Sequence, residues 1–366
     1  MSFYIYQKTK WPQFYWENDT FMASLSTVRN LQGKLLGKME SVGFALKSEA
    51  FLQTLTLDVL KSSEIEGEIL HPEQVRSSIA RHLGMDVAGL VSSDRNVDGV
   101  VEMLLDATQL YENKLTKERL FNWHSSLFPT GRNGMYKLKV GNWRDDSQGA
   151  MQVVSGAMGK EIVHYQAPSA DKIETEMESF FNWFNTENSL EPVLKAAIAH
   201  FWFVTIHPFE DGNGRIARAI TDMLLARSDG SNQRFYSMSA QIKLERKVYY
   251  EILEKCQKRD LDITKWIEWF LTCLTNSLKE TDTILVKVLH KHYFWLENNH
   301  LIFNERQKSI LNKLLDGFDE KLTSSKWAKI NKCSADTALR DIQDLINKEI
   351  LRKELAGGRS TNYELI

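Results

Sequence analysis

A twelve-residue stretch from His207 to Arg218 carries the side chains of this chain that are best suited to chemistry. An imidazole stands at its start, and a carboxylate, Asp211, follows four residues later. A Gly-Asn-Gly turn at 212–214 comes next, and Arg215 and Arg218 add two guanidinium groups. A base, a metal-binding acid, a turn whose N–H groups can surround an anion, and two positive charges are the parts needed to hold a nucleotide and attack one of its phosphates.

Each part of this stretch has a simpler explanation when it is taken alone. A Gly-Asn-Gly sequence is usually only a turn. His207 and Asp211 could form a metal pair as in a hydrolase, although no further His/Asp cluster lies close in the sequence to complete it. Phe209 we expect to anchor the loop on the core. Only the combination indicates nucleotide chemistry.

The flanking residues predict two helices that position this stretch. Residues 196–206 are rich in helix formers and apolar groups and contain no breaker. They predict a buried helix that ends near His207-Pro208, because a residue before proline is disfavoured in the α region. Residues 215–227 predict the next helix. A glycine turn entering a helix exposes unpaired N–H donors in a positive potential, and the missing Cβ atoms let phosphate approach. We therefore expect a diphosphate cradle at 212–214.

The stretch resembles the signature of the Fic family, His-x-Phe-x-(Asp/Glu)-Gly-Asn-Gly-Arg-x-x-Arg. Every specified position is present here, as His207, Phe209, Asp211, Gly212, Asn213, Gly214, Arg215 and Arg218. The resemblance implies an ATP-dependent enzyme that transfers AMP to Ser, Thr or Tyr hydroxyls of target proteins and of itself. Three alternatives stay open: removal of AMP, transfer of another phosphate-containing group on the same scaffold, and a DNA-binding regulator whose Fic core is a sensor or inactive.

The resemblance also implies a role for each residue of the signature. His207 would accept the proton of the attacking hydroxyl, a task that suits a neutral imidazole near pH 7. Asp211 would bind Mg²⁺, which offsets negative charge on the phosphates. Asn213 and the backbone of the glycine turn would hold the α-phosphate, and Arg215 and Arg218 would bind the β- and γ-phosphates.

Two short β-favouring runs, 151–154 and 161–165, surround a glycine-containing turn and predict a hairpin. With the preceding Gly141-Asn-Trp-Arg segment, they resemble the flap of Fic proteins, a hairpin over the active site that aligns the target by strand addition. The resemblance places four flap residues at the nucleotide: Val153, Val154, Ser155 and Gly156. A plain surface hairpin is the alternative interpretation.

A later segment, 245–253, resembles the helix of the family in which a Tyr-Tyr pair approaches adenine and ribose. Tyr249 and Tyr250 are the matching residues, and Gln257 stands where relatives often carry Asn. Aromatic residues on a helix belong to a core more often than to a ligand site, which is the alternative here.

Many Fic proteins contain an inhibitory pattern, (Ser/Thr)-x-x-x-Glu-(Gly/Asn). The residues from Ser62 to Glu66 and Gly67 fit this pattern, and so do residues 108–113, which end on Glu112-Asn113. Residues 52–60 predict a helix that Gly67 would end, so we favour the first match and expect an inhibitory helix around 52–67.

We expect Glu66 to pair with Arg218 and to remove this arginine from γ-phosphate binding. ATP would then bind with its α-phosphate poorly aligned for attack. Two alternatives stay open: Glu66 is a solvated residue at a helix end, or, as in some relatives, it positions water for the removal of AMP.

The composition sets broad limits on the class of protein. With 366 residues, 43% of them hydrophobic and 26% charged, the chain can bury a large core, and we expect a mainly α fold. A net charge of −2 gives no general attraction to nucleic acid or to anionic membranes. No run of 18 apolar residues predicts a membrane span, and three scattered cysteines (Cys256, Cys273 and Cys333) favour a cytoplasmic protein.

Three regions can be distinguished along the chain. They are a helical N-terminal module at 1–105 with an aromatic lead at Trp11–Trp16, a helical Fic core at 106–290 that a long helix at 263–289 completes, and a small third region at 301–366.

The third region predicts helices at 305–315, 324–330 and 335–348, with Ser334 as a cap, and two strands, 350–354 and 361–365, around Gly357-Gly358. This order resembles a winged helix-turn-helix, whose third helix would enter DNA. Because that helix carries Asp336, Asp341 and Asp344, we favour protein recognition or dimerisation and leave DNA binding and a homodimer as possibilities.

Overall fold

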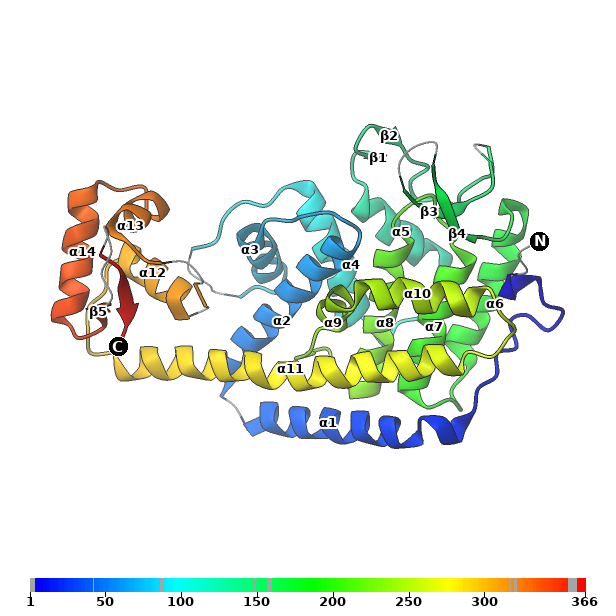
Figure 1. Cartoon of the computed structure of the whole chain (residues 1–366), viewed down its shortest axis with the longest axis horizontal. Coiled ribbons are helices and arrows are strands. Elements are labelled where there is room, and N and C mark those ends of the chain that lie inside the picture. The colour runs from blue at the N-terminus through cyan, green and yellow to red at the C-terminus, as the bar shows by residue number, and fades with distance from the viewer. Residues whose placement is uncertain are drawn as a thin grey trace. The chain divides into compact units, whose positions relative to one another are not determined.

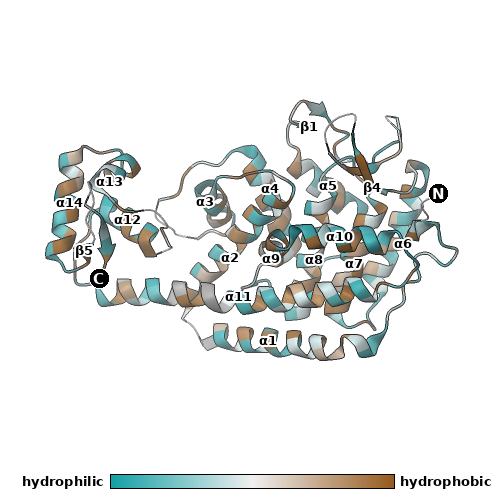
Figure 2. Ribbon diagram, viewed as in Figure 1, coloured by the Kyte–Doolittle hydropathy of each residue, from teal (hydrophilic) through white to brown (hydrophobic). Residues whose placement is uncertain are grey.

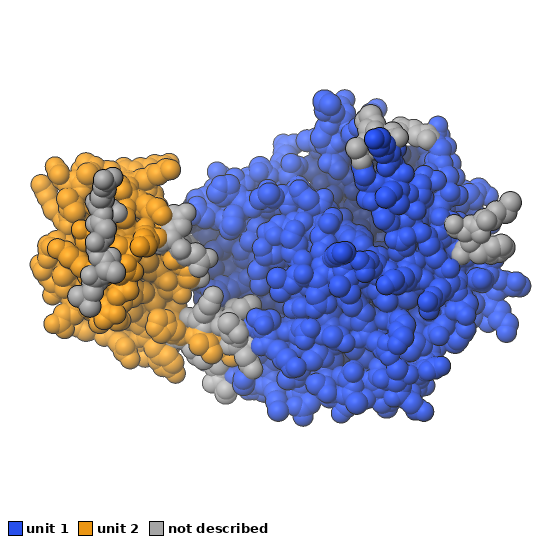
Figure 3. Space-filling model, in the orientation of Figure 1, with its two compact units in different colours: residues 1–281 blue, residues 282–366 orange. Residues whose placement is uncertain are grey.

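The structure is a computed structural model that describes residues 4–41, 43–85, 89–147, 149–156, 160–315, 317–318, 321–354 and 361–366. It confirms the mainly α fold: helices dominate, and the strands form only two-stranded sheets (Figure 1). The chain divides into two compact units, Met1–Thr281 and Asp282–Ile366 (Figure 3), and the border falls inside one long helix.

The α-helices of the first unit are α1 (Met22–Ser41), α2 (Phe44–Ile65), α3 (Pro72–His82), α4 (Arg95–Gln109), α5 (Lys117–Leu127), α6 (Ile173–Thr186), α7 (Pro192–Ile206), α8 (Asn213–Asp229), α9 (Met238–Leu244) and α10 (Arg246–Gln257). The long helix α11 (Thr264–Glu297) continues into the second unit. The strands of the first unit form two antiparallel pairs, β1 (Arg132–Asn133) with β2 (Tyr136–Lys137) and β3 (Gln152–Ser155) with β4 (Ile162–Gln166).

Helices α7 and α8 pack together at the centre of the first unit. Every residue of α7 from Val193 to Ile206 is buried, and the buried helix predicted for 196–206 begins four residues earlier, at Pro192. The helix ends at Ile206, because Pro208 disfavours the α conformation of the residue before it. Helix α8 begins at Asn213, two residues earlier than expected, so that only the first glycine of the Gly-Asn-Gly turn lies outside it.

The N-terminal region and the expected catalytic core belong to one compact unit. Helix α2 packs against α3 and α9, and it also contacts α4 and α8. The aromatic lead packs on the core as well, since the ring of Trp11 contacts Trp202 of α7 and its Nε1 donates to Glu176 at 2.8 Å. The boundary expected near residue 105 therefore does not separate compact units.

The second unit contains the order of elements that the sequence predicts. Helices α12 (Glu305–Leu315), α13 (Ser324–Ile330) and α14 (Ala335–Asn347) precede the antiparallel strands β5 (Leu351–Lys353) and β6 (Tyr363–Leu365). Ser334 caps α14, because its hydroxyl accepts from the backbone N–H of Thr337. Gly357-Gly358, expected between the strands, lies outside the described residues.

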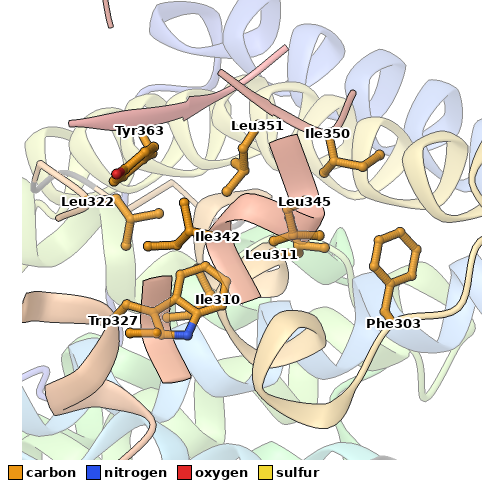
Figure 4. Close-up of a cluster of buried hydrophobic side chains, with 11 residues drawn as sticks. Phe303, Ile310, Leu311, Leu322, Trp327, Ile342, Leu345, Ile350, Leu351 and Tyr363 are labelled. Atoms are coloured by element: carbon orange, nitrogen blue, oxygen red, sulfur yellow. The ribbon is translucent and has the colours of Figure 1, made fainter. Parts of the chain in front are cut away.

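One hydrophobic core holds the second unit together. Apolar and polar residues alternate along α14 (Figure 2), and the buried apolar ones, Ala338, Ile342 and Leu345, belong to the cluster. Figure 4 shows this cluster, which gathers Phe303, Ile310, Leu311, Leu322, Trp327, Ile342, Leu345, Ile350, Leu351 and Tyr363.

Two of the three aspartates of α14 are paired inside the second unit. The carboxylate of Asp341 accepts from the Nε and Nη2 of Arg306 at 2.7 and 2.9 Å. Asp344 pairs with Lys348 and accepts from Gln307 at 2.8 Å. Repulsion of phosphate by this helix is therefore weaker than its sequence suggests.

The described helices contain no segment that is long and apolar enough to cross a membrane. The three cysteines are free, and Cys256 and Cys273 are buried in the first unit.

Candidate active site

The loop from His207 to Gly212 joins α7 to α8 and carries both the base and the acid of the motif. His207 adopts a left-handed conformation with φ of 54°, which is uncommon for a residue with a Cβ and needs neighbours to hold it. Asn213 supplies such contacts: its side-chain amide donates to the carbonyl of Phe209 at 2.8 Å and accepts from the N–H of Phe209 at 3.0 Å. Phe209 is fully buried, which confirms the expected anchor. The contact of Asn213 with an α-phosphate stays a prediction.

One nitrogen of His207 is available for chemistry. Its Nδ1 lies 3.2 Å from the carbonyl oxygen of Val204, and because a carbonyl only accepts, the proton of the neutral ring belongs on Nδ1. Burial lowers the pKa of His207 to about 4, against a smaller opposing effect of the Val204 carbonyl. At neutral pH, Nε2 therefore carries a free lone pair that can accept a proton from a hydroxyl.

Arg144 fixes this loop to the far end of the flap. Its Nε donates to the carbonyl of His207 at 2.8 Å, and another nitrogen of the same guanidinium donates to the carbonyl of Pro168. Asp146 balances the charge through a contact of 2.9 Å. Because Arg144 is buried, these bonds hold the base and the flap in a fixed relation.

Asp211 is held from three sides. One carboxylate oxygen accepts from the N–H of Gly212 at 2.5 Å, and the other accepts from the side-chain amide of Asn133 in β1. The backbone carbonyl of Asp211 lies 3.2 Å from Nε2 of His124. Since Nδ1 of His124 accepts from the N–H of Gly141, Nε2 is the protonated nitrogen and donates to Asp211.

The donor set at Asp211 fits Mg²⁺ that is bound together with a nucleotide. Within the described parts of the chain, no three His, Cys, Asp or Glu side chains form a metal site by themselves. Mg²⁺ keeps several water ligands and is commonly held by one or two carboxylates with substrate phosphates, so a single carboxylate beside an anion site suits it. A cation at this carboxylate would compete with the amide of Asn133 for the same oxygen.

Arg215 and Arg218, in the first turns of α8, are both buried, and each is bonded to a glutamate from the segment after α2. Nη2 of Arg218 lies 2.8 Å from Oε1 of Glu66, and Nη1 of Arg215 lies 2.7 Å from Oε2 of Glu68. Ser62 adds two acceptors to Arg218, its hydroxyl and its carbonyl, both at 2.9 Å. The arginines that could bind phosphate are thus both occupied by the chain's own carboxylates.

The carboxylate of Glu66 lies directly on the first turn of α8. A Cβ on Gly214 would come within 2.1 Å of its Oε1, so the carboxylate uses the space that a glycine leaves at a helix N-terminus. Burial raises the pKa of Glu66, but Arg218, together with Arg215 and Arg246, lowers it more, and the net pKa is below its ordinary value. Glu66 is therefore ionised and occupies an anion site.

Both arginines keep a donor that is not used. Nη1 of Arg218 and Nε of Arg215 are buried and have no hydrogen-bond acceptor among the described residues. A buried donor without an acceptor is costly. Nη1 of Arg218 lies 3.2 Å from the place of a Cβ on Gly214, so the free donor faces the same turn as Glu66. The site has capacity for further anionic oxygens.

The second match to the inhibitory pattern lies at the other end of α8. Thr108 is buried, and its hydroxyl donates to the carbonyl of Leu104. The carboxylate of Glu112 lies close enough to Arg227, near the C-terminus of α8, to raise the pKa of this arginine against the larger effect of burial. The structure therefore brings the 62–67 segment, and not the 108–113 segment, to Arg218. Gly67, with φ of 88°, follows the end of α2 as expected.

The expected flap is present as the β3–β4 hairpin at one edge of the first unit (Figure 1). The hydroxyl of Tyr165 donates to the carbonyl of Thr205 at 2.6 Å, which fixes β4 beside the end of α7. Val153 packs in a small cluster with Tyr4 and Tyr165. The other flap residues expected at the nucleotide are exposed: Val154, Ser155 and Gly156.

The two tyrosines of α10 lie beside the arginine and glutamate pair, whereas Gln257 lies elsewhere. Tyr249 is buried, and its hydroxyl lies 2.9 Å from Nε2 of His200. The nearby charge of Arg218 lowers the pKa of that hydroxyl against the larger effect of burial. The hydroxyl of Tyr250 donates to Oε2 of Glu66 at 3.4 Å. Gln257 is buried and donates to Thr205 at 3.3 Å. Contacts of these residues with adenine stay predictions.

Several residues that build the site were not identified from the sequence. A sequence signal was available for Glu68, because it repeats the carboxylate of Glu66 two residues later in the segment Glu-Gly-Glu. One was also available for Arg144, which ends the Gly-Asn-Trp-Arg segment that resembles the family. His124 and Asn133 had none, since they lie 87 and 78 residues from Asp211 in sequence and only the fold brings them there.

Two family models match this chain. Residues 4–85 match a domain of unknown function, DUF4172, and residues 114–225 match the Fic/DOC family. The first match includes Ser62, Glu66 and Glu68, and the second includes the whole segment from His207 to Arg218. The two matches together therefore include the glutamates and the arginines that pair at the site.

Curated relatives and solved structures agree with the second match. The chain is 26% identical over 235 residues to a protein adenylyltransferase Fic of Drosophila mojavensis, and 34% identical over 235 residues to that of Drosophila virilis. Each alignment covers 63% of this chain but only 41% and 43% of the relatives, so the chain spans less than half of their length.

Two solved structures share the fold. A Fic family protein from Desulfovibrio desulfuricans G20 aligns with a TM-score of 0.54 and 19% identity over 96% of this chain and 97% of that one. A Fic domain-containing signaling protein from Bacteroides thetaiotaomicron VPI-5482 aligns with a TM-score of 0.53 and 21% identity over 71% of this chain and 97% of that one. This chain contains a domain of the Fic/DOC family at residues 114–225.

Proposed function

We propose that this protein is an adenylyltransferase that moves AMP from ATP to Ser, Thr or Tyr hydroxyls of target proteins and of itself, and that Glu66 keeps it inactive. The observation that carries the proposal is the carboxylate of Glu66 on the first turn of α8, bonded to Arg218 at 2.8 Å in an anion site next to His207. Relatives named protein adenylyltransferase support the same reaction.

In the proposed reaction, His207 acts as the base. The acceptor hydroxyl gives its proton to Nε2 while its oxygen forms a bond to the α-phosphorus, and the bond from that phosphorus to the β-phosphate breaks to release pyrophosphate. The N–H groups at the start of α8 and the guanidiniums of Arg215 and Arg218 hold the phosphates. Asp211 would hold Mg²⁺, which would supply positive charge to the phosphate oxygens.

Inhibition follows from competition between carboxylates and phosphates. Glu66 occupies Arg218 and the space on Gly214, and Glu68 occupies Arg215. A triphosphate that enters has to displace them or bind in a shifted position, with the α-phosphorus out of line for attack. Each hydrogen bond to a charged group contributes ~1.5–3 kcal/mol, enough to bias the equilibrium between a blocked and an open site.

The test is transfer of label from α-labelled ATP with Mg²⁺ to protein. Glu66→Gly should be labelled strongly and the wild type weakly, and Glu66→Gly/His207→Ala should lose the label on every hydroxyl that has no other base beside it. Glu64→Gly is the matched control, because Glu64 lies in the same turn and pairs with Lys61 at 2.8 Å rather than with an arginine of α8. ATP binding measured by calorimetry, without labelling in any variant, would exclude AMP transfer.

AMP removal is a second candidate on the same geometry. The ionised Glu66 lies close enough to His207 to raise the pKa of its imidazole, so the two groups could orient a water molecule toward a phosphate ester. A modified target added to the wild type and to Glu66→Gly distinguishes the directions: removal requires Glu66, whereas addition increases without it.

A DNA-binding regulator is a third candidate, and it rests on the second unit. The pairing of Asp341 with Arg306 and of Asp344 with Lys348 leaves α14 with less uncompensated negative charge. Tight, sequence-specific binding to duplex DNA, combined with no turnover of ATP by Glu66→Gly, would favour it over AMP transfer.

A further inference from the structure

Three side chains of the flap and of α10 form a hydrogen-bonded relay that the proposed reaction does not use. The hydroxyl of Ser155 lies 2.6 Å from Nε2 of His164, and Nδ1 of His164 lies 2.7 Å from Oε2 of Glu254. Ser155 is exposed, and His164 and Glu254 are each about one third exposed, at 33% and 32%. The order of serine, imidazole and carboxylate is that of an activated nucleophile.

An irregularity in the hairpin makes this relay possible. Val153 pairs with Tyr165 and Val154 pairs with Val163, so that His164 has no partner across the sheet and forms a β-bulge. A bulge redirects the side chain of the extra residue and leaves its neighbours in register. Here Tyr165 stays buried beside α7, and His164 reaches both Ser155 and α10.

The hydrogen bonds determine which atom carries each proton. Glu254 is ionised, because Lys258 lies 2.5 Å from its Oε1 and His164 donates to it; these contacts lower its pKa although burial raises it. An ionised carboxylate only accepts, so Nδ1 of His164 carries the ring proton. In the neutral ring Nε2 is then an acceptor, and the hydroxyl of Ser155 donates to it. With the ring neutral, Ser155 is thus bonded to a base that can take its proton.

Both ends of the relay are attached to elements that border the phosphate site. On the flap, the residue after His164 is Tyr165, whose hydroxyl is fixed to Thr205 two residues before His207. On α10, Glu254 lies about one turn after Tyr250, whose hydroxyl contacts Glu66. The nucleophile therefore belongs to elements that contact the end of α7 and Glu66, beside which the nucleotide binds in the proposed function.

We propose that Ser155 is a modification site built into the chain: an acceptor hydroxyl for AMP, with His164 as its base. The oxygen of Ser155 forms a bond to the α-phosphorus of ATP, the bond from that phosphorus to the β-phosphate breaks, pyrophosphate leaves, and the proton passes to Nε2 of His164. This step rests on the proposed function for its co-substrate. The reactivity of Ser155 itself does not.

The competing explanation is that the relay only holds the flap against α10. In that case Ser155 is an ordinary exposed serine, with no unusual reactivity toward electrophiles. A general base contributes ~10²–10⁴-fold to a rate, so loss of His164 separates the two explanations by a wide margin.

The first experiment tests the nucleophile without ATP. The full chain is treated with a fluorophosphonate probe, and the labelled residue is mapped by mass spectrometry. We expect label on Ser155, none in Ser155→Ala, and a rate at least ~10-fold lower in His164→Ala. Ser179→Ala is the matched control and should not change labelling, because its hydroxyl is exposed and donates only to the carbonyl of Thr175 in α6. Absence of label, or label that is insensitive to His164→Ala, would overturn the proposal.

The second experiment maps AMP on Glu66→Gly after incubation with ATP and Mg²⁺. AMP on Ser155 that disappears in Ser155→Ala and decreases in Glu254→Gln supports the proposal. AMP only on other residues would overturn it and leave the proposed function intact. No AMP anywhere and no release of pyrophosphate would reject the proposed function, while the fluorophosphonate result would still decide whether Ser155 is a nucleophile.

Discussion

Two buried arginines of the first unit, Arg218 and Arg234, are each paired with a carboxylate, but the two pairs differ in access to solvent. The Arg218 side chain is 3% exposed and its partner Glu66 is 30% exposed. Arg234 and Asp222 are both enclosed, at 2% and 3%. A pair with one accessible partner can be opened by a competing anion, whereas an enclosed pair is a fixed part of the core. Arg218 and Asp222 both belong to α8, so the same helix carries the pair that we propose as a switch and a pair that supports the core.

The enclosed pair also has a different charge balance. Asp58 of α2 lies beside Asp222 and accepts from Ser237 at 2.6 Å, so two carboxyl groups share one arginine. Burial, with the neighbouring Asp58, raises the pKa of Asp222 to about 7 although Arg234 opposes it. The pKa of Glu66 is instead below its ordinary value, because several arginines surround one carboxylate.

The largest effect is expected from breaking the enclosed pair. Arg234→Met leaves Asp222 and Asp58 buried without a cation, and we expect a loss of ~3–5 kcal/mol in the free energy of unfolding. Glu66→Gln, at the accessible pair, should lower it less, by ~1–2 kcal/mol, because the amide oxygen can still accept a hydrogen bond from Arg218. Urea denaturation of both variants and the wild type measures the difference. Similar losses in the two variants would contradict the distinction between switch and support.

The second effect is a dependence of stability on pH that has opposite signs at the two pairs. Asp222 has a folded pKa of about 7 against an ordinary value of 3.8, so between these values the folded chain holds a proton that the unfolded chain has released. Its contribution therefore decreases as pH rises through this window. The contribution of Glu66 is present above its ordinary pKa and is lost as pH falls through its lower folded value.

Asp222→Asn tests that sign. The amide cannot titrate, so the difference in urea midpoint between about pH 5 and about pH 8 should become smaller in the variant than in the wild type. Glu66→Gln is the control and should leave this difference unchanged, because Glu66 titrates below the window. A wild-type midpoint that rises over the same window would show that another group dominates.

The sequence predicted the parts of the site that depend on local signals. Pro208 ends α7 and Gly67 follows the end of α2 where we expected, because each acts on the backbone of its neighbours. The start of α8 was placed two residues too late, since Asn213 and Gly214 read as a turn but adopt the helix once the Asn213 side chain is bonded to Phe209.

Contacts between distant segments could not be predicted in this way. Arg215 and Glu68 are 147 residues apart in sequence, and Ser155 and Glu254 meet only through the bulge at His164. The pairing of Glu66 with Arg218 was expected because of a family resemblance and not because a local pattern contains it.

The two carboxylates of the proposed switch, Glu66 and Glu68, should differ in what they do to ATP binding. Glu68 bonds the arginine that would bind a terminal phosphate, but no contact places it on Gly214. In the Glu66→Gly background, Glu68→Gln should therefore lower KM for ATP by ~3–10-fold with little change in kcat, as for a competitor worth about 1 kcal/mol. Initial rates over a range of ATP concentrations measure both constants. The same assay on Glu64→Gln controls for the loss of a nearby charge, and a change confined to kcat would assign Glu68 a role in alignment.

The smallest effect concerns the weakest bond of the accessible pair. Tyr250 donates to Glu66 at 3.4 Å, and its ring also stacks on the guanidinium of Arg246 at 4.9 Å. Tyr250→Phe removes the hydroxyl and keeps the ring, so a long and exposed bond worth less than ~0.5 kcal/mol is lost, and basal labelling should rise by no more than about twofold. Arg218 holds Glu66 through a shorter, charged contact that the variant does not touch. A rise of tenfold or more in the labelling assay would mean that the hydroxyl of Tyr250, rather than Arg218, sets the position of Glu66, and the switch would then lie between α2 and α10 instead of between α2 and α8.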